Sequence, residues 1–257
     1  MKDQIVSFSG GKDSTAMLHM MLEHGEPISE VIFFDTGWEF PEMFDHIERV
    51  EANTGLRITR LRPEKPFTYW MFERPIVARK GPNKGQVHRI GNGWPSPTRR
   101  WCTKIKTTAI EKHIARWPDP VTCIGFAVDE VHRTRTKTQR NGKHPKRYPL
   151  IEYDVDEVEA LRYCRVLGYD WGGLYDVFSR VSCYCCPLQR IGELRRLRRH
   201  RPDQWQAMLK MDRMAPGHNR GFKGYDTVHD LEERFRKETE MQLLPPLKLE
   251  CSRCSST

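Results

Sequence analysis

The residues most able to do chemistry near the N-terminus form one string, Ser9-Gly10-Gly11-Lys12-Asp13-Ser14. An apolar run at 4–8 precedes the string and predicts a strand, and a run rich in helix formers at 14–22 follows it. A strand, a glycine turn and a helix start aim backbone N–H groups and the positive end of the helix dipole at one point. Lys12 adds a full positive charge there, so the string predicts a phosphate-binding loop.

Three cysteines form the second group. Cys102 follows two arginines and a tryptophan at a predicted helix N-terminus, a setting that lowers a thiol pKa and favours metal ligation or nucleophilicity. Cys183 and Cys186 form a Cys-X-X-Cys pair, which is a common metal-binding spacing. Three thiolates can hold a 4Fe–4S cluster with one iron open, and zinc with a fourth ligand from Cys185 or a histidine is the alternative.

The elements that must position these residues are strands that alternate with helices. Val31 to Phe34 form a continuous apolar run, typical of a buried parallel strand, and Asp35-Thr36 follow it directly. Further strands are predicted at 56–59 and 121–125, and the second ends at Gly125. We expect an α/β fold with an open, mostly parallel twisted sheet and helices on both faces, whose ligand edge lies at the carboxyl ends of the strands.

We place this core at residues 1–150 and a helical, cysteine-bearing substrate subdomain with a flexible C-terminal tail at 151–257. Prolines and glycines predict that 62–100 is mostly loop, and 148–151 is predicted to be extended. The apolar positions of the next helix predict inward-facing side chains at Val155, Val158, Leu161 and Cys164. The apolar positions of a later helix predict core packing by Trp205, Met208 and Met211.

Charge and composition point to an anionic partner. The 257 residues carry a formal net charge of +9, and basic stretches at 133–147 and 190–201 suggest nucleic acid, DNA or transfer RNA, with Trp94 and Trp101 available for stacking. No apolar run is long enough for a membrane span and no signal-peptide core is present, so we expect a cytoplasmic protein. Eight cysteines then indicate metal or redox chemistry.

The glycine–lysine string resembles the pyrophosphate-binding loop of the N-type ATP pyrophosphatases, the PP-loop superfamily. It is not a Walker A loop, because no glycine stands at the required earlier position. The string Phe33-Phe34-Asp35-Thr36-Gly37-X-X-Phe40-Pro41-Glu42 resembles the phosphoadenylylsulfate (PAPS) reductase branch. The resemblance implies Mg²⁺ and ATP, cleavage between the α and β phosphates, catalytic roles for Lys12, Asp13 and Cys102, and nucleotide contacts from Ser7, Ser9, Gly10, Gly11, Lys12, Asp13, Ser14, Asp35, Thr36 and Gly125.

Three departures from the reductase pattern affect the expected activity. Ala127 stands where the family has an arginine, and Arg133 is the candidate replacement as a phosphate contact. No histidine follows Glu250-Cys251, and Lys12, which reductases tend to lack, is present. The last two departures favour ATP-driven activation over reduction of a sulfonucleotide.

We therefore expect an ATP pyrophosphatase that adenylates a substrate, a nucleic acid, for sulfur transfer. The DNA phosphorothioation ATP pyrophosphatases and the transfer-RNA thiolases, which the chain resembles, belong to this class, and the sulfur would come from a donor such as a cysteine desulfurase. The alternatives are a PAPS reductase and a non-catalytic regulator that binds nucleotide or nucleic acid. A homodimer and the roles of Cys251 and Cys254 stay open.

Overall fold

In the computed structural model, residues 2–135, 143–215 and 221–243 are described, with side chains up to residue 240. A five-stranded parallel sheet has the order β3-β2-β1-β6-β7. Its strands are Asp3–Phe8 (β1), Glu30–Phe34 (β2), Ile58–Leu61 (β3), Pro120–Ile124 (β6) and Lys146–Arg147 (β7). The predicted α/β fold with a parallel sheet is confirmed.

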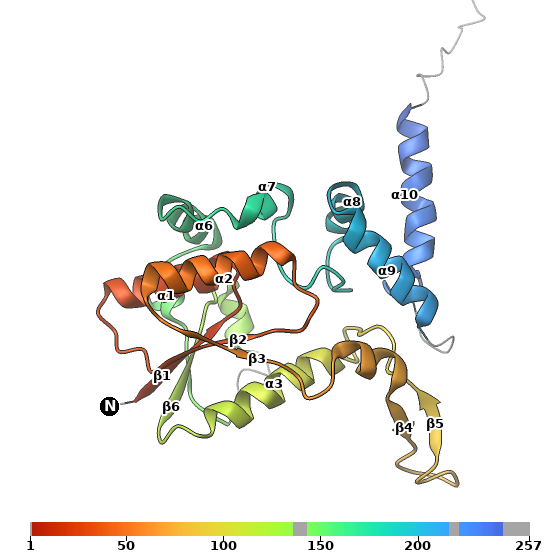
Figure 1. Cartoon of the computed structure of the whole chain (residues 1–257), viewed down its shortest axis with the longest axis horizontal. Coiled ribbons are helices and arrows are strands. Elements are labelled where there is room, and N and C mark those ends of the chain that lie inside the picture. Colours follow the sequence, from red (N-terminus) through yellow and green to blue (C-terminus); the bar gives the residue numbers. More distant parts are fainter. Residues whose placement is uncertain (1, 136–142, 216–220, 244–257) are drawn as a thin grey trace, which may run out of the picture.

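Helices cover both faces of this sheet (Figure 1). The helices α1 (Lys12–Glu23) and α2 (Pro41–Thr54) lie on one face, and Met17, Met43 and Ile47 are fully or almost fully buried there. The helix α3 (Trp101–Ile114) lies on the other face, where Ile114 packs with Ile5 of β1 and Ile32 of β2. Both faces of the sheet are therefore covered, as is typical of a parallel sheet.

A further layer of short helices packs on α1. It contains α5 (Pro149–Glu152), α6 (Glu157–Val166), the 3₁₀ turn η3 (Trp171–Gly173) and α7 (Leu174–Val177). Two local predictions are wrong here. Residues 149–152 are helical, because a proline suits the first position of a helix. Val158 is 76% exposed, since Ala160 and Cys164 form the buried side of α6.

The stretch 62–100 contains more regular structure than the predicted loop. It holds a π-helical turn η1 (Tyr69–Glu73) and a two-stranded antiparallel ribbon, β4 (Pro75–Val77) with β5 (Val87–Ile90). The ribbon projects from the body of the protein at the end where α3 begins (Figure 1). Gly91 follows β5 with a φ of +72°, and an added Cβ would lie 2.3 Å from the Met71 carbonyl oxygen, so the root of the ribbon requires glycine.

The last described elements are α8 (Ile191–His200), α9 (Pro202–Met214) and α10 (Val228–Leu243). Trp205, Met208 and Met211 are buried, which confirms the predicted core role of α9. Among the described residues, no helix is long and apolar enough to cross a membrane. Cys251 and Cys254 lie outside the described residues.

One large hydrophobic cluster contains residues from both sides of position 150. Phe8, Met17 and Phe34 belong to it, and so do Trp171 and Trp205. The division at residue 150 stays a prediction, and the packing shows that the two parts share buried surface.

His46 of α2 links this cluster to the glycine–lysine string. Its ring stacks on Trp171 with centroids 4.4 Å apart, and its Nε2 lies 2.9 Å from Thr15 Oγ1. Burial, together with the charges of Arg49 and His19, lowers the pKa of His46 to about 3, although the charge of Asp170 raises it. The imidazole is therefore neutral in the folded protein.

Because His46 is neutral in the folded protein, the free energy of unfolding decreases as the pH is lowered. Between about pH 6.5 and pH 3 the unfolded chain binds a proton at His46 that the folded chain does not, so the free energy of unfolding decreases as pH falls. We expect a loss of about 2 kcal/mol from this residue between pH 7 and pH 5. Urea unfolding of wild type and of His46→Gln at both pH values measures it. Identical pH dependence in the two proteins would contradict the assignment.

Candidate functional site

The carboxyl ends of three neighbouring strands bring the predicted nucleotide-binding residues together. Ser7 and the string from Ser9 belong to β1 and its end, Asp35 and Thr36 follow β2, and Gly125 follows β6. A Cβ added at Gly125 would lie 3.0 Å from the Asp13 carbonyl oxygen, so the two segments are in close contact. The structure thus gathers these residues at one edge, while ATP binding by them stays a prediction.

The loop from Ser9 to Ser14 is held by its own hydrogen bonds. The Ser9 N–H donates to Ser14 Oγ at 3.1 Å, and this hydroxyl donates to the Gly11 carbonyl at 3.0 Å. Gly10 has a φ of +77°, and a Cβ there would lie 2.7 Å from Met43 Cε. The indole N–H of Trp171 donates to the Gly10 carbonyl at 2.7 Å. The loop conformation is therefore set by the fold.

Lys12 of this loop is buried with two carboxylates. Its Nζ donates to Asp13 Oδ1 and to Glu157 Oε2, both at 2.7 Å, and its side chain is 7% exposed. Burial lowers the pKa of Lys12, but the two carboxylates outweigh it and the pKa is raised. Burial is also the main cause that raises the pKa of Asp13. The ammonium is charged and is fixed at the loop.

Tyr175 of α7 contacts the same loop. Its hydroxyl accepts a hydrogen bond of 2.8 Å from the Lys12 N–H, and burial raises its pKa. Sequence reasoning missed Tyr175, Glu157 and Trp171. They lie 145 to 163 positions away from the loop along the chain, and no local pattern links them to it.

The segment after β2 forms a second polar cluster. Asp35 is buried and accepts hydrogen bonds of 2.8 Å from the Gly37 N–H and from Arg62 Nε. It does not cap α2, whose N-cap position is Phe40. Thr36 Oγ1 donates to Glu39 Oε1 at 2.6 Å, and burial raises the pKa of Glu39. Glu39 was also missed, although it lies inside the Asp-Thr-Gly string.

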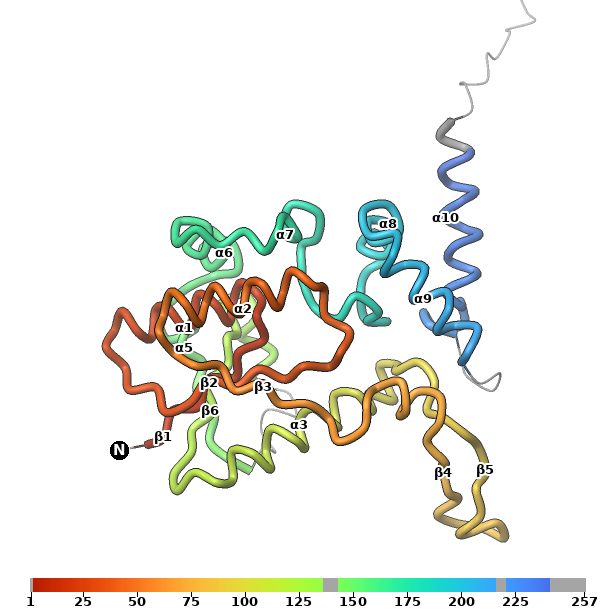
Figure 2. The backbone as a smooth tube through the Cα atoms, in the orientation of Figure 1, coloured from red at the N-terminus to blue at the C-terminus, as the bar shows by residue number. Residues whose placement is uncertain are grey.

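The chain between α7 and α8 carries the cysteines to this cluster (Figure 2). The Tyr184 N–H donates to the Trp38 carbonyl at 2.9 Å, and Cys183 Sγ lies 3.4 Å from Thr36 Oγ1. The carbonyl of Val181 lies 3.9 Å from the Cβ position of Gly11. The segment 181–186 therefore lies against both the loop and the Asp35–Glu39 cluster.

The predicted low pKa of the Cys102 thiol is wrong. Cys102 lies in the first turn of α3 as expected, but burial raises its pKa more than the bonds from Thr103 lower it, and the charge of Cys186 raises it further. Burial also raises the pKa of Cys183 to about 12 and that of Cys185 well above its usual value. These thiols are protonated at neutral pH without a metal.

The predicted metal ligands are neighbours but do not form a metal site as their side chains stand. Cys186 lies close enough to Cys102 and to Cys183 for its charge to raise both pKa values. Within the described part of the chain, no three Cys, His, Asp or Glu side chains are arranged to hold a metal ion. Cys185 is 2% exposed and belongs to the hydrophobic core.

Arg133 lies in the 3₁₀ helix η2 (Val128–Arg135), after β6. Its guanidinium pairs with Glu130 and lies 4.1 Å from the centroid of the Phe126 ring. The charge of Glu130 contributes to the raised pKa of Asp13, so η2 borders the glycine–lysine loop. Arg133 is thus near the predicted nucleotide site and is neutralised by its own helix.

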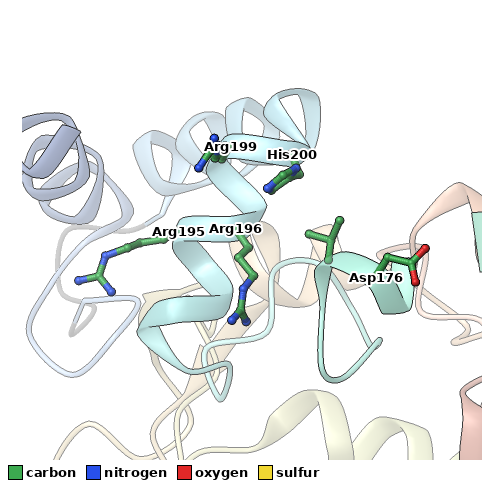
Figure 3. A pocket seen from close by; sticks show the side chains of 6 residues that line it. Asp176, Arg195, Arg196, Arg199 and His200 are labelled. Atoms are coloured by element: carbon green, nitrogen blue, oxygen red, sulfur yellow. The ribbon is translucent and has the colours of Figure 1, made fainter. Parts of the chain in front are cut away.

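A cavity of about 310 Å³ lies between α7 and α8 (Figure 3). It is lined by Asp176 and Val177 of α7 and by Arg195, Arg196, Arg199 and His200 of α8. Arg195 pairs with Glu238 and Arg196 with Glu193, and Asp176 pairs with Arg165. Most of the charged side chains that line the cavity are therefore paired within the protein.

The basic stretches predicted to bind nucleic acid are also largely paired where they are described. In 190–201, Arg198 pairs with Glu232 and Arg201 with Glu42, in addition to the two pairs of the cavity. In 133–147, Arg147 pairs with Glu26 and Glu152, and residues 136–142 lie outside the described chain. These ion pairs reduce the charge that either stretch can offer to phosphate.

Similar proteins are found among curated sequences and solved structures. Two uncharacterized proteins of Methanocaldococcus jannaschii are 28% identical over 228 residues and 24% identical over 217 residues. The matches cover 86% and 79% of this chain but 44% and 47% of those proteins, so the chain spans less than half of their length.

A sulfate adenylyltransferase subunit 2 of Streptomyces lavendulae is 42% identical over 57 residues, which are 21% of this chain and 18% of that protein. The crystal structure of a PAPS reductase from Candida auris in complex with phosphate aligns with a TM-score of 0.46 and 14% identity. The alignment covers 70% of this chain and 80% of the PAPS reductase chain.

The model of the phosphoadenosine phosphosulfate reductase domain matches residues 3–189, a range that contains both polar clusters and the Cys-X-X-Cys pair. The chain therefore belongs to the PAPS reductase domain family of the PP-loop superfamily, as the two N-terminal strings indicated.

Proposed function

We propose that this protein cleaves ATP between the α and β phosphates and adenylates an oxygen of a nucleic acid, which sulfur then replaces. The observation that carries this proposal is the glycine–lysine loop, where a charged Lys12 and the start of α1 meet at the ligand edge of the sheet. The local similarity to a sulfate adenylyltransferase subunit, a protein named for adenylyl transfer, supports the same chemistry.

The loop suits the departing pyrophosphate. The first N–H groups of α1 and the helix dipole attract an anion, and the Lys12 ammonium, held at the loop by Asp13 and Glu157, can exchange these carboxylates for phosphate oxygens. Charge that develops on the leaving group is then met by groups already in place, which is the main source of rate in such sites.

Mg²⁺ fits the same place. Magnesium bound with nucleotide phosphates takes only one or two protein carboxylates, and Asp13 and Glu157 supply two beside the loop. The ion would neutralise phosphate charge there.

The cysteines fit the sulfur step of this proposal. The Cys183 thiol donates to Glu39 Oε1 at 3.8 Å, and the charge of Glu39 raises the pKa of this thiol, so a bound cation is needed beside Cys183 for it to ionise. We propose Cys102, Cys183 and Cys186 as ligands of a 4Fe–4S cluster, with zinc as the alternative, on the evidence of their proximity alone.

Reduction of a sulfonucleotide is the second candidate, and membership of the PAPS reductase domain family favours it. Sulfite release from PAPS identifies that reaction, whereas pyrophosphate and AMP release from ATP identifies the first. A regulator without catalysis would release none of these products.

Lys12→Ala should reduce pyrophosphate release from ATP by about 10²–10³-fold, the usual effect of removing one preorganised charge from a transition state. Circular dichroism should show a folded protein, and Lys210→Ala, an exposed lysine of α9, is the matched control. Unchanged pyrophosphate release in Lys12→Ala would remove the basis of the proposal.

Tyr175→Phe should bind ATP more tightly. ATP must replace the Tyr175 hydroxyl at the Lys12 N–H, and losing a hydrogen bond of this kind changes the free energy by about 0.5–1.5 kcal/mol. Isothermal titration with a non-hydrolysable ATP analogue should show affinity about 2- to 10-fold higher. Weaker binding would mean that the hydroxyl contacts the nucleotide instead.

The protein purified without oxygen should contain about four iron and four sulfide per chain. Cys102→Ser, Cys183→Ser and Cys186→Ser should each lose them, because each removes one proposed thiolate. Cys123→Ala, which lies on β6 beside Gln4, should retain them and is the control. About one zinc per chain and no iron would select the zinc alternative.

A further inference from the structure

One segment carries the whole net charge of the protein. Between Arg74 and Ile110 the chain has nine lysines and arginines and no aspartate or glutamate. The other 34 lysines and arginines are balanced by the 34 aspartates and glutamates, so the remaining chain is formally neutral. The net charge of +9 is therefore a property of this segment, which contains the β4–β5 ribbon and the start of α3.

The cations of the segment differ in their pairing from the arginines of α8 and α10. Arg79, Lys80, Lys84, Arg100 and Lys104 are exposed, and none of them forms an ion pair with any described carboxylate. Most arginines of α8 and α10, by contrast, pair with glutamates of these two helices, and Arg201 after α8 pairs with Glu42 of α2. Unpaired charge is what a polyanion can use.

The ribbon presents this charge on a projecting shape (Figure 1). Arg79, Lys80 and Lys84 lie in its turn, between the strands β4 and β5. The paired residues Val77 and Val87 are 45% and 55% exposed. A two-stranded ribbon fits the major groove of B-form DNA, which is about 12 Å wide and offers thymine methyl groups to apolar side chains. The deep, narrow major groove of double-stranded RNA does not admit it.

A cavity of about 290 Å³ lies at the foot of the ribbon. It is lined by Asn92, Arg99, Arg100, Trp101 and Lys104. Its walls are fixed, because Asn92 Nδ2 donates to the Trp70 carbonyl at 2.8 Å and Trp101 Nε1 donates to the Gly93 carbonyl at 3.0 Å. Asn92 follows the ribbon after one glycine, so the cavity and the ribbon form one continuous basic surface.

This surface reaches the ligand edge of the sheet. Trp101 lines the cavity and packs edge-on against Trp38, with ring centroids 6.2 Å apart. Trp38 bonds through its carbonyl to the segment that carries Cys183, and Cys102 is the next residue after Trp101. A backbone phosphate held in the cavity would therefore lie beside the cluster where we place the sulfur step.

We propose that the β4–β5 ribbon and the cavity at the start of α3 form a binding surface for double-stranded DNA. The ribbon enters the major groove, its turn contacts the two flanking backbones, and the cavity holds a phosphate group. The inference rests on the proposed function only for the reaction that follows binding, since binding itself requires no ATP.

Fluorescence anisotropy with a 20-base-pair duplex, without ATP and across a salt series, tests the surface. The triple variant Arg79→Gln, Lys80→Gln, Lys84→Gln should bind at least ten times more weakly. Its slope of log affinity against log salt should be smaller by about 2–3, because each lost phosphate contact removes about 0.9. Arg100→Gln with Lys104→Gln should reduce the slope by about 2.

The matched control neutralises the same number of cations on α10, with Arg234→Gln, Arg236→Gln and Lys237→Gln, which pair with glutamates. It should bind as wild type does. Equal weakening in both triple variants would overturn the proposal, since net charge alone would then govern binding. No weakening in the ribbon variant would also overturn it, because the DNA would then bind elsewhere on the protein. Equal affinity for double-stranded RNA would overturn the placement in the major groove.

The ribbon also has open strand edges, so a second copy of the chain is a competing occupant. A dimer in light scattering that the ribbon variant loses, without DNA binding by wild type, would replace the proposal. The DNA-binding assay contains no ATP, so its result does not depend on the proposed adenylation. A wild-type protein that binds DNA but releases no pyrophosphate would contradict the adenylation alone, and the reverse result would contradict the DNA surface alone.

Discussion

The buried ammonium of Lys12 is the interaction on which the arrangement of the site depends. An isolated charge cannot be taken out of water without a large cost, so the fold must bring carboxylates to it. Asp13 is its neighbour in the chain, but Glu157 comes from α6, in the layer that packs on α1. The same layer supplies Trp171 and Tyr175 to the loop. One charge therefore connects the phosphate-binding loop to helices far along the sequence. Ligand binding there becomes an exchange of partners.

The parallel sheet imposes the second constraint. Because β1, β2 and β6 run in the same direction, the loop, the Asp35–Glu39 cluster and Gly125 must meet at one edge. The segment with Cys183 closes over this edge and is bonded to Trp38. Closure removes water from the thiols and raises their pKa values, with that of Cys183 at about 12. The reactivity of the cysteines is thus controlled by burial, and the charge of Glu39 raises the pKa of Cys183 further, so a bound cation is required to ionise it.

The sequence alone could predict those parts of the site that rest on local patterns. The glycine–lysine string and the apolar run before Asp35 predicted the strand ends, because strand, turn and helix signals lie within a few residues. Glu157 and Tyr175 could not be predicted, since their role depends on how α6 and α7 pack. The pKa of Cys102 was mispredicted for a related reason: its neighbours in sequence are cations, but the burial that dominates comes from distant segments.

The position of the unpaired positive charge also depends on the fold and cannot be read from the composition. The net charge of the chain predicted an anionic partner, and the basic stretches in the second half were the obvious place for it. Folding brings glutamates from α2, α8 and α10 to those arginines, a result that no count of residues contains. The segment from Arg74 to Ile110 has no acidic residues of its own. Like charges on a small ribbon and one helix turn repel one another, which lowers the stability of that region. An anion that lies along the ribbon would relieve the repulsion, so the feature that costs stability in the free protein is also the one that favours an extended polyanion.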